Sequence, residues 1–188
     1  HFEAVLRAIP VQCKALRSLS IIVLHLSRTE ACPASVREAC TFLLQSALKL
    51  PCLASLDLKL PFPPLHTDSM EISAPLVRLC LADEGGIDVS FTRSLCSLLP
   101  RMCSLTSFGA EYSANAECTL QIFDAVQSCH TLRSLAFYNC EGVVTILQRF
   151  SEISAEDASY FLPQLERIAF SLAEVDSWEL DWELLSSA

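Results

Sequence analysis

The sequence is poor in glycine, and this scarcity excludes the common phosphate-binding loops. Its 188 residues include four glycines, at positions 85, 86, 109 and 142. Their spacing forms neither the dinucleotide-binding pattern G-x-G-x-x-G nor the P-loop pattern G-x-x-x-x-G-K-[ST]. We therefore expect no cradle for a nucleotide phosphate and no cofactor.

Basic residues and long apolar runs are scarce as well. There are 13 Lys and Arg against 22 Asp and Glu, which gives a net charge of −9. Phosphate backbones are bound by concentrated Lys and Arg, so we expect no nucleic-acid partner. The most apolar run, LSIIVLHL at 19–26, has the length of a strand and is far shorter than the roughly 18 residues of a membrane span. We therefore expect no membrane partner.

The acidic excess is strongest near the C-terminus. All charged residues of AEVDSWELDWELL, at 173–185, are acidic. Because runs of like charge are commonly solvated, we interpret this segment as a solvated tail. The alternative is an acidic contact for a basic partner surface.

Patterns for metal binding and nucleophilic catalysis are missing too. The ten cysteines include no C-x-x-C pair, and the four histidines lie in unrelated contexts without a G-x-S-x-G pattern. In SCHTLRSLAFYNC, at 128–140, we expect Cys129 and His130 at the end of a helix and Cys140 in a core position. We therefore expect no metal site, no catalytic residue and no disulfide. Free, largely buried cysteines favour a reducing compartment, so we expect an intracellular protein, cytoplasmic or nuclear.

What the sequence does contain is an internal repeat. Six segments fit the pattern L-x-x-φ-x-φ, where φ is usually apolar, and follow one another at intervals of 23 to 37 residues. The alternation of the last two apolar positions predicts a strand in each segment. The anchor leucines that open the six segments are Leu16, Leu53, Leu76, Leu105, Leu132 and Leu165.

Helical periodicity fills most of the intervals between the predicted strands. Ser35 and Glu38 have the spacing of a capping box for one of these helices, and Ser154 is a candidate cap for another. The proline-rich stretch 60–70 and the turn-forming stretch 82–88 interrupt the helical pattern. We predict helices within 2–9, 35–48, 91–99, 116–129, 143–150 and 155–162.

Strands that alternate with helices predict an α/β fold with a parallel sheet. Two architectures fit this order: an open doubly wound sheet, and a solenoid of stacked strand-and-helix units. The recurring L-x-x-L-x-L motif favours the solenoid, because the strands of a doubly wound sheet share no repeated motif.

The repeats resemble leucine-rich repeats of the ribonuclease-inhibitor-like class, whose consensus is L-x-x-L-x-L-x-x-N/C-x-L. LRSLAFYNC fits it best, with Leu132, Leu135, Phe137 and Cys140 in the expected places. The resemblance implies a leucine-rich-repeat solenoid of about six irregular repeats. A curved parallel β-sheet would line its concave side and helices its convex side. Residues 1–188 would form a single leucine-rich-repeat domain and a fragment of a longer chain.

Irregular repeat lengths, LPxL lead-ins and a Trp-containing end are similar to the C-terminal repeat region of fungal F-box proteins. This resemblance implies a substrate-recruiting part of an F-box-type ubiquitin ligase subunit. The ligase adaptor would then be bound only through an F-box outside this segment.

Strand residues that alternate with the apolar positions would point to the concave face. Tyr and Arg are frequent energetic anchors of interfaces, so Tyr138, Arg78 and Arg167 are the leading candidates. We predict a non-enzymatic domain that binds a protein partner on this face; the alternative is a solvated face without a partner. The predicted partner-binding residues are Ser55, Asp57, Lys59, Arg78, Glu111, Tyr138 and Arg167.

Two further hypotheses stay open. An α/β enzyme would carry its site at the C-terminal ends of the strands, where Asp83, Glu111 and Asn139 follow apolar residues. A structural role, as the capping segment of a longer solenoid, is the other.

Overall fold

The computed structural model describes residues 2–22, 33–60, 70–83, 89–112, 116–152, 163–172 and 175–181. Three predictions fall outside these ranges. They are the proline-rich interruption at 61–69, most of the turn at 84–88, and the helix at 155–162 with its Ser154 cap.

The chain alternates between strands and helices. Its helices are α1 (Phe2–Gln12), α2 (Ala34–Ala47), α3 (Val89–Leu98), the short 3₁₀ helix η1 (Leu99–Arg101), α4 (Ala116–Val126) and α5 (Val143–Glu152). Its strands are β1 (Ser18–Ile22), β2 (Ser55–Lys59), β3 (Arg78–Asp83), β4 (Ser107–Tyr112), β5 (Ser134–Tyr138), β6 (Arg167–Leu172) and β7 (Val175–Asp181).

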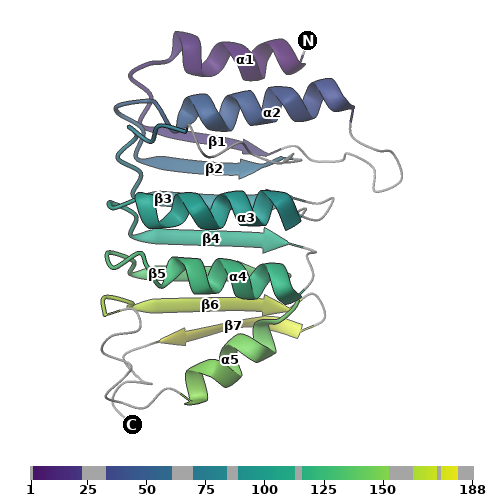
Figure 1. Cartoon of the computed structure of the whole chain (residues 1–188), viewed down its shortest axis with the longest axis vertical. Helices are drawn as coiled ribbons and strands as arrows, with labels where there is room; N and C mark the ends of the chain where they lie inside the picture. Colours follow the sequence, from purple (N-terminus) through teal and green to yellow (C-terminus); the bar gives the residue numbers. More distant parts are fainter. Residues whose placement is uncertain are drawn as a thin grey trace.

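All strands belong to one seven-stranded sheet in which the spatial order is the chain order, β1 to β7. The first six strands are parallel, and β7 is antiparallel to β6. The helices lie on one face of this sheet and stack in chain order alongside the strands (Figure 1). The predicted α/β class with a parallel sheet is confirmed, and the arrangement is that of a solenoid-like stack. A doubly wound sheet does not fit, because it carries helices on both faces.

The core lies between the sheet and the helix layer. Each parallel strand sends alternate apolar residues toward the helices, and the register places these residues in two continuous rows. The first row contains Leu19, Leu56, Leu79, Phe108, Leu135 and Ile168. The second contains Ile21, Leu58, Leu81, Ala110, Phe137 and Phe170. From β2 onward these side chains are at most 3% exposed, as expected for repeats that are covered by a neighbouring repeat on each side.

The anchor leucine fixes the turn that leads into most strands. The Leu53 amide donates to the Leu50 carbonyl, and the Leu105 and Leu132 amides make the same bond to the residue three positions earlier. These three side chains are fully buried. A tight turn and a buried leucine therefore recur together before β2, β4 and β5, which explains why the L-x-x-φ-x-φ pattern marks these strands.

Two sequence-based predictions are wrong. The capping box is absent, because α2 begins at Ala34 after Pro33, and the Ser35 hydroxyl instead donates to Glu3 of α1 at 2.8 Å. The acidic C-terminal segment is not simply a solvated tail, since Val175–Asp181 forms strand β7 and pairs with β6.

The predicted burial of two cysteines is confirmed. The nine cysteines that the structure describes form no disulfide with one another. Cys129 and Cys140 are buried, as expected, and Cys140 Sγ lies 3.6 Å from the Ala110 carbonyl. His130 is exposed in the turn after α4, four residues past the end of that helix.

Candidate functional site

The face of the sheet opposite the helices is the candidate functional site, and we call it the helix-free face. Its side chains form three rows across the six parallel strands. The first row contains Ser18, Ser55, Arg78, Ser107, Ser134 and Arg167. The middle row contains Ser20, Asp57, Cys80, Gly109, Ala136 and Ala169. The third row contains Ile22, Lys59, Ala82, Glu111, Tyr138 and Ser171.

The middle row is lined by small residues from β3 onward. Gly109 packs closely against its neighbour Cys80, because a Cβ added at position 109 would lie 3.2 Å from Cys80 Sγ. The larger side chains of the face stand on either side of this row. The face therefore has a low centre bordered by Arg78 and Arg167 on one side and by the third row on the other.

Arg78 and Arg167 occupy equivalent positions three strands apart, about 14 Å at the usual spacing of strands. Both are exposed. No ion pair joins either guanidinium to a carboxylate whose side chain the structure describes.

The third row carries the most connected polar cluster of the face. Lys59 Nζ lies 3.3 Å from Glu111 Oε1, although β3 separates their strands. The residue between them is Ala82, which is 5% exposed. Asn139 adds a third member, since its Nδ2 donates to Glu111 Oε1 at 3.3 Å.

Asn139 is held in place by its backbone at the end of β5. Its φ of 53° lies in the left-handed region, which asparagine tolerates better than most residues. Its amide donates to the Ser171 carbonyl at 2.7 Å. This bend places the side-chain amide beside Glu111 and lets the chain turn toward α5.

Tyr138 precedes this bend and is 38% exposed, the one exposed aromatic side chain among the strand residues whose side chains the structure describes. It lies in register with Glu111 on one side and Ser171 on the other. A partly fixed aromatic ring beside a charged cluster is a common anchor of a protein interface.

Cys80 sits in the middle row under the influence of Asp57. Burial raises the pKa of its thiol to about 11, and the negative charge of Asp57 adds to this effect. The thiol is therefore protonated at neutral pH, and a thiolate nucleophile is not available on this face.

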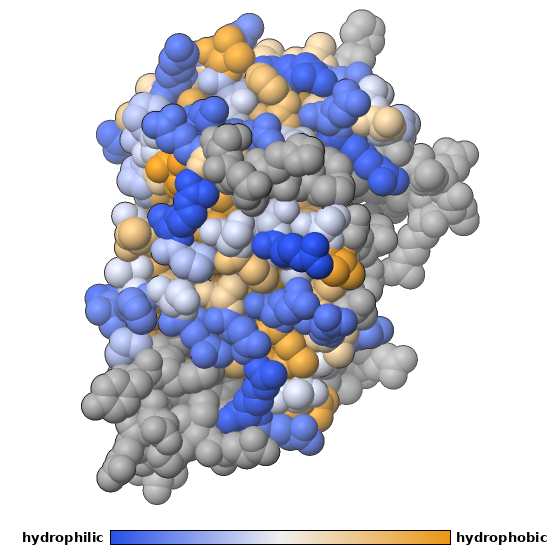
Figure 2. Space-filling view, viewed as in Figure 1, coloured by the Kyte–Doolittle hydropathy of each residue, from blue (hydrophilic) through white to orange (hydrophobic). Residues whose placement is uncertain are grey.

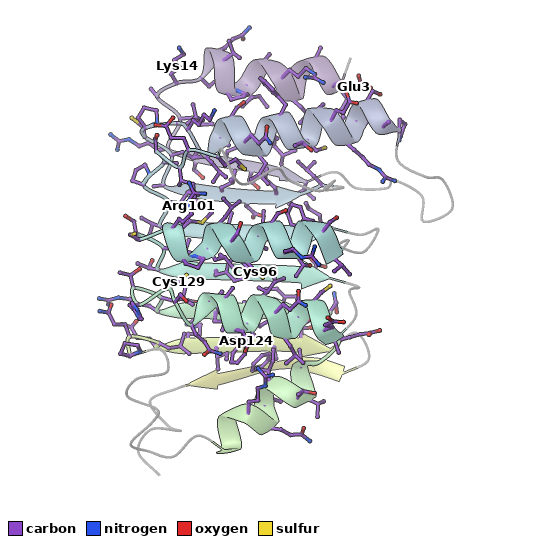
Figure 3. All side chains as sticks on the ribbon, in the orientation of Figure 1. Glu3, Lys14, Cys96, Arg101, Asp124 and Cys129 are labelled. Atoms are coloured by element: carbon purple, nitrogen blue, oxygen red, sulfur yellow. The ribbon has the colours of Figure 1, made fainter. Side chains whose placement is uncertain are left out.

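The helix layer uses its charges differently. Asp124 of α4, labelled in Figure 3, accepts from Arg149 of α5 at 2.6 Å, and Glu3 of α1 accepts from Ser35 of α2. These bonds join neighbouring helices. These outer polar groups of the helices thus stabilise the stacking of neighbouring helices. The side chains of Arg78, Arg167 and Tyr138 make no bond of this kind to another described residue.

The structure places all seven predicted residues on the helix-free face and brings Lys59 and Glu111 together. It keeps the three predicted anchors apart, since Arg78 and Arg167 lie in the first row and Tyr138 in the third. The sequence reasoning missed the ion pair and the row of small residues. The signal was present: Lys59, Ala82, Glu111 and Tyr138 each lie six positions after an anchor leucine.

Two residues of the alternative site at the strand ends come together. Glu111 and Asn139 meet, as described, and Asp83 pairs in register with Tyr112 at the end of β3. The Glu111 carboxylate of this site is already engaged in the ion pair with Lys59. Among the residues described, no group of three or more His, Cys, Asp or Glu side chains could hold a metal ion.

Comparison of the chain with protein-family models, curated proteins and solved structures gives no significant match. The resemblance to leucine-rich repeats therefore stays a prediction. In the part of the chain that is described, no helix is long and apolar enough to cross a membrane.

Proposed function

We propose that this chain is a non-enzymatic leucine-rich-repeat domain that binds a protein partner across its helix-free face. One observation carries the proposal: six successive strands present their outward side chains in aligned rows that no described helix covers. Stacked repeats that share one exposed sheet face make extended binding surfaces. Curvature of this sheet, with the helix-free face concave, belongs to the same proposal.

The chemistry of the face fits a protein rather than a small molecule. Its candidate anchors lie on three strands, β3, β5 and β6, with Arg78 and Arg167 about 14 Å apart and Tyr138 across the middle row. A partner that reaches both guanidiniums presents acidic or carbonyl groups along one side. An apolar side chain of the partner would pack on the Tyr138 ring, and small groups would fill the middle row.

The Lys59–Glu111 pair contributes specificity rather than affinity. Its two charges already satisfy one another, so a partner gains little by contacting either alone. A partner with an unmatched charge at this point would have to break the pair. The cluster therefore selects against misplaced charges.

A narrower role follows from the resemblance to fungal F-box proteins: recruitment of a substrate to a ubiquitin ligase. In this role the helix-free face binds the substrate, and an F-box outside the segment binds the adaptor. The test is co-purification from cells. The full-length protein should retain the ligase adaptor, and residues 1–188 alone should not. An adaptor retained equally by both would contradict the division of roles.

The binding proposal itself is tested by site-specific photo-crosslinking. A benzophenone amino acid replaces Tyr138 in one variant and the exposed Arg93 of α3 in a control variant. The first variant should form a discrete adduct with a cellular protein on irradiation, and the second should not. Equal adducts from both positions, or adducts from position 93 alone, would refute the assignment of the face.

A further inference from the structure

The chain carries most of its positive charge in short segments around the six anchor leucines. Each segment runs from four residues before an anchor leucine to two residues after it. Together the six segments contain seven of the 13 Lys and Arg of the chain but one of its 22 Asp and Glu. A chain with a net charge of −9 therefore has a recurring segment in which basic residues predominate.

Six of these seven basic residues form pairs that take the same place in two different segments, and the seventh is Lys14. Equivalent places of stacked repeats lie in line with one another. The sequence therefore arranges the positive charges in rows that cross the strands. The pairs are Lys49 and Arg101, four positions before an anchor leucine, Arg17 and Arg133, one position after it, and Arg78 and Arg167, two positions after it.

The structure joins the six segments along one edge of the stack, where the strands begin. The Arg17 carbonyl accepts from the amides of Ala54 and Ser55 in the next segment. The same pair of bonds links each later segment to its successor, through the carbonyls of Ala54, Val77, Thr106 and Arg133. We call the surface formed by these six segments the basic edge.

The basic side chains of this edge are on the surface. All seven residues are exposed. Figure 3 shows Lys14 and Arg101 on the same side of the molecule, the side where the strands begin, and Glu3 toward the opposite side. Figure 2 shows hydrophilic residues at several levels of the stack along that side. The positive charges thus extend along the surface of several repeats.

Little of this charge is neutralised by described residues. Arg133 Nη1 lies 2.8 Å from Glu166 Oε1, the one acidic residue of the basic edge, and both side chains are more than half exposed. Arg101 donates to the Met70 carbonyl, a neutral group. Glu71 lies just before the third segment and is exposed. No carboxylate that the structure describes forms an ion pair with Lys14, Arg17, Lys49, Arg78 or Arg167.

The length of the basic edge suits a short extended peptide. Six parallel strands in register are separated by five strand spacings, about 24 Å in total. An extended chain of about seven residues covers this distance at about 3.3 Å per residue. Carboxylates of such a peptide match arginine well, because the guanidinium fork binds a carboxylate through two parallel hydrogen bonds.

The same surface is poorly suited to nucleic acid. Proteins bind single strands by stacking the bases on aromatic side chains, and the six segments contain neither Tyr nor Trp. The other 21 Asp and Glu of the chain lie outside the basic edge, with the other six Lys and Arg. A long polyanion that extends beyond the edge is therefore repelled, whereas a short acidic segment is not.

We propose that the basic edge binds an acidic, extended segment of a protein partner, laid across the repeats where the strands begin. Arg78 and Arg167 belong both to this edge and to the first row of the helix-free face. A partner on that face would thus reach the basic edge without a gap. Recognition of the acidic segment does not rest on the helix-free face, because the other five basic residues lie outside its predicted binding residues.

The test is fluorescence anisotropy with a labelled peptide of about twelve residues in which Glu and Ser alternate, long enough to span the edge. The peptide should bind the 188-residue chain at low ionic strength, although both carry a net negative charge. Affinity should fall at least about tenfold at an ionic strength of about 1 M, where the Debye length is about 3 Å. A peptide with Gln in place of Glu should not bind. Absence of binding, or equal binding of the Gln peptide, overturns the proposal.

Charge reversal locates the site. The edge variant carries Arg17→Glu and Lys49→Glu, and the control carries Arg37→Glu and Arg93→Glu near the starts of α2 and α3. The two variants have the same net charge, so a difference between them reports the position of the charges. The edge variant should bind the Glu peptide at least about tenfold more weakly than the parent chain, and the control within about twofold. Equal losses overturn the proposal.

Thermal unfolding verifies the fold of each variant. If the reversal at the edge disturbs folding, Arg17→Gln with Lys49→Gln removes the charges without adding negative ones and should still weaken binding about threefold or more. Unchanged affinity in this folded variant contradicts the proposal.

A single-stranded oligonucleotide with a similar number of charges tests the choice of partner. It should bind no more tightly than the Glu peptide, and tighter binding would assign the edge to nucleic acid and overturn the proposal. Crosslinking at Tyr138 reports on the helix-free face alone. Failure of this proposal and failure of the partner-binding proposal are therefore separate results.

Discussion

Lys59 of β2 and Glu111 of β4 form an ion pair over the residue that separates them, Ala82 of β3. Two parallel strands that flank a third are about 10 Å apart, so the pair is formed only by long side chains that lean over a small one. Ala82 is 5% exposed beneath them. The ion pair therefore depends on long charged side chains at positions 59 and 111 and on a small side chain at position 82, which are equivalent positions of three successive repeats.

This dependence predicts a measurable coupling. The side chains of Lys59 and Glu111 are 23% and 35% exposed, so the pair should contribute on the order of 1 kcal/mol or less to stability. A double-mutant cycle with Lys59→Met and Glu111→Gln, followed by urea unfolding, should give a coupling of that size. In an Ala82→Ile background, where a branched side chain fills the space, the coupling should vanish. An unchanged coupling in that background would show that the pair does not depend on Ala82.

Phe137 and Tyr138 are neighbours in β5 and should behave in opposite ways. Phe137 is fully buried, with its ring centroid 6.3 Å from Phe170 and 6.4 Å from Phe123. Phe137→Ala should lower the free energy of unfolding by about 3–5 kcal/mol, because a large core cavity is left. Tyr138→Ala should change it by about 0.5 kcal/mol or less. Equal losses, measured by urea unfolding, would contradict the assignment of the two faces of β5.

The buried thiols predict a loss of stability in alkaline solution. Burial raises the pKa of Cys80, Cys96 and Cys129 from 9.0 to about 11. The next largest cause of the raised pKa is the charge of Asp57 for Cys80, of Cys118 for Cys96 and of Cys103 for Cys129. Above pH 9 the unfolded chain loses these protons while the folded chain keeps them, so stability should fall between pH 9 and 11. The stabilising contribution is complete below pH 9.

The control is a variant with all three cysteines replaced by alanine. Its stability, measured by denaturant unfolding at each pH, should fall less steeply over the same interval than that of the parent chain. Parallel curves for the two proteins would show that these thiols do not titrate as described.

Two fully buried threonines should tolerate loss of their hydroxyls. Thr92 of α3 and Thr119 of α4 are 0% exposed, and their Oγ1 atoms have no hydrogen-bond partner among the residues described. Thr92→Val and Thr119→Val should therefore be neutral or stabilising, since an unsatisfied buried hydroxyl costs about 1–3 kcal/mol. Thr131→Val is the matched comparison, because Thr131 Oγ1 lies 2.8 Å from the Leu105 carbonyl. It should be destabilised by about 1 kcal/mol. Comparable destabilisation of all three variants in thermal unfolding would contradict this account.

The repeat pattern predicted the strands because one sequence feature fixed both the turn and the core. Leu132 closes the turn through its amide and is buried, and Leu135 and Phe137 then alternate into the core. The same alternation assigned Tyr138 to the opposite face. Contacts that span repeats were harder to foresee. Lys59 and Glu111 are 52 residues apart, and their meeting depends on a register that one segment alone does not specify.

The two errors have physical causes. The capping-box prediction at Ser35 failed because the N-cap of α2 is Pro33, two residues earlier, which leaves the Ser35 hydroxyl to donate to Glu3. The interpretation of 173–185 gave weight to charge and overlooked a period of two. Trp178, Leu180 and Trp182 alternate with acidic residues, a pattern typical of a strand. Neither error changed the assignment of the six parallel strands.

The affinity of the crosslinked partner tests the central claim most directly. The chain with Arg78→Ala, Tyr138→Ala and Arg167→Ala should be compared with a control that carries Arg37→Ala, Arg93→Ala and Leu147→Ala, all at exposed sites of the helix layer. If the helix-free face binds the partner, the first variant should lose at least about 100-fold in affinity by calorimetry, since interface anchors contribute about 2 kcal/mol or more each. The control should stay within a few-fold of the parent chain. Unchanged affinity in the first variant, with its thermal unfolding intact, would contradict the account.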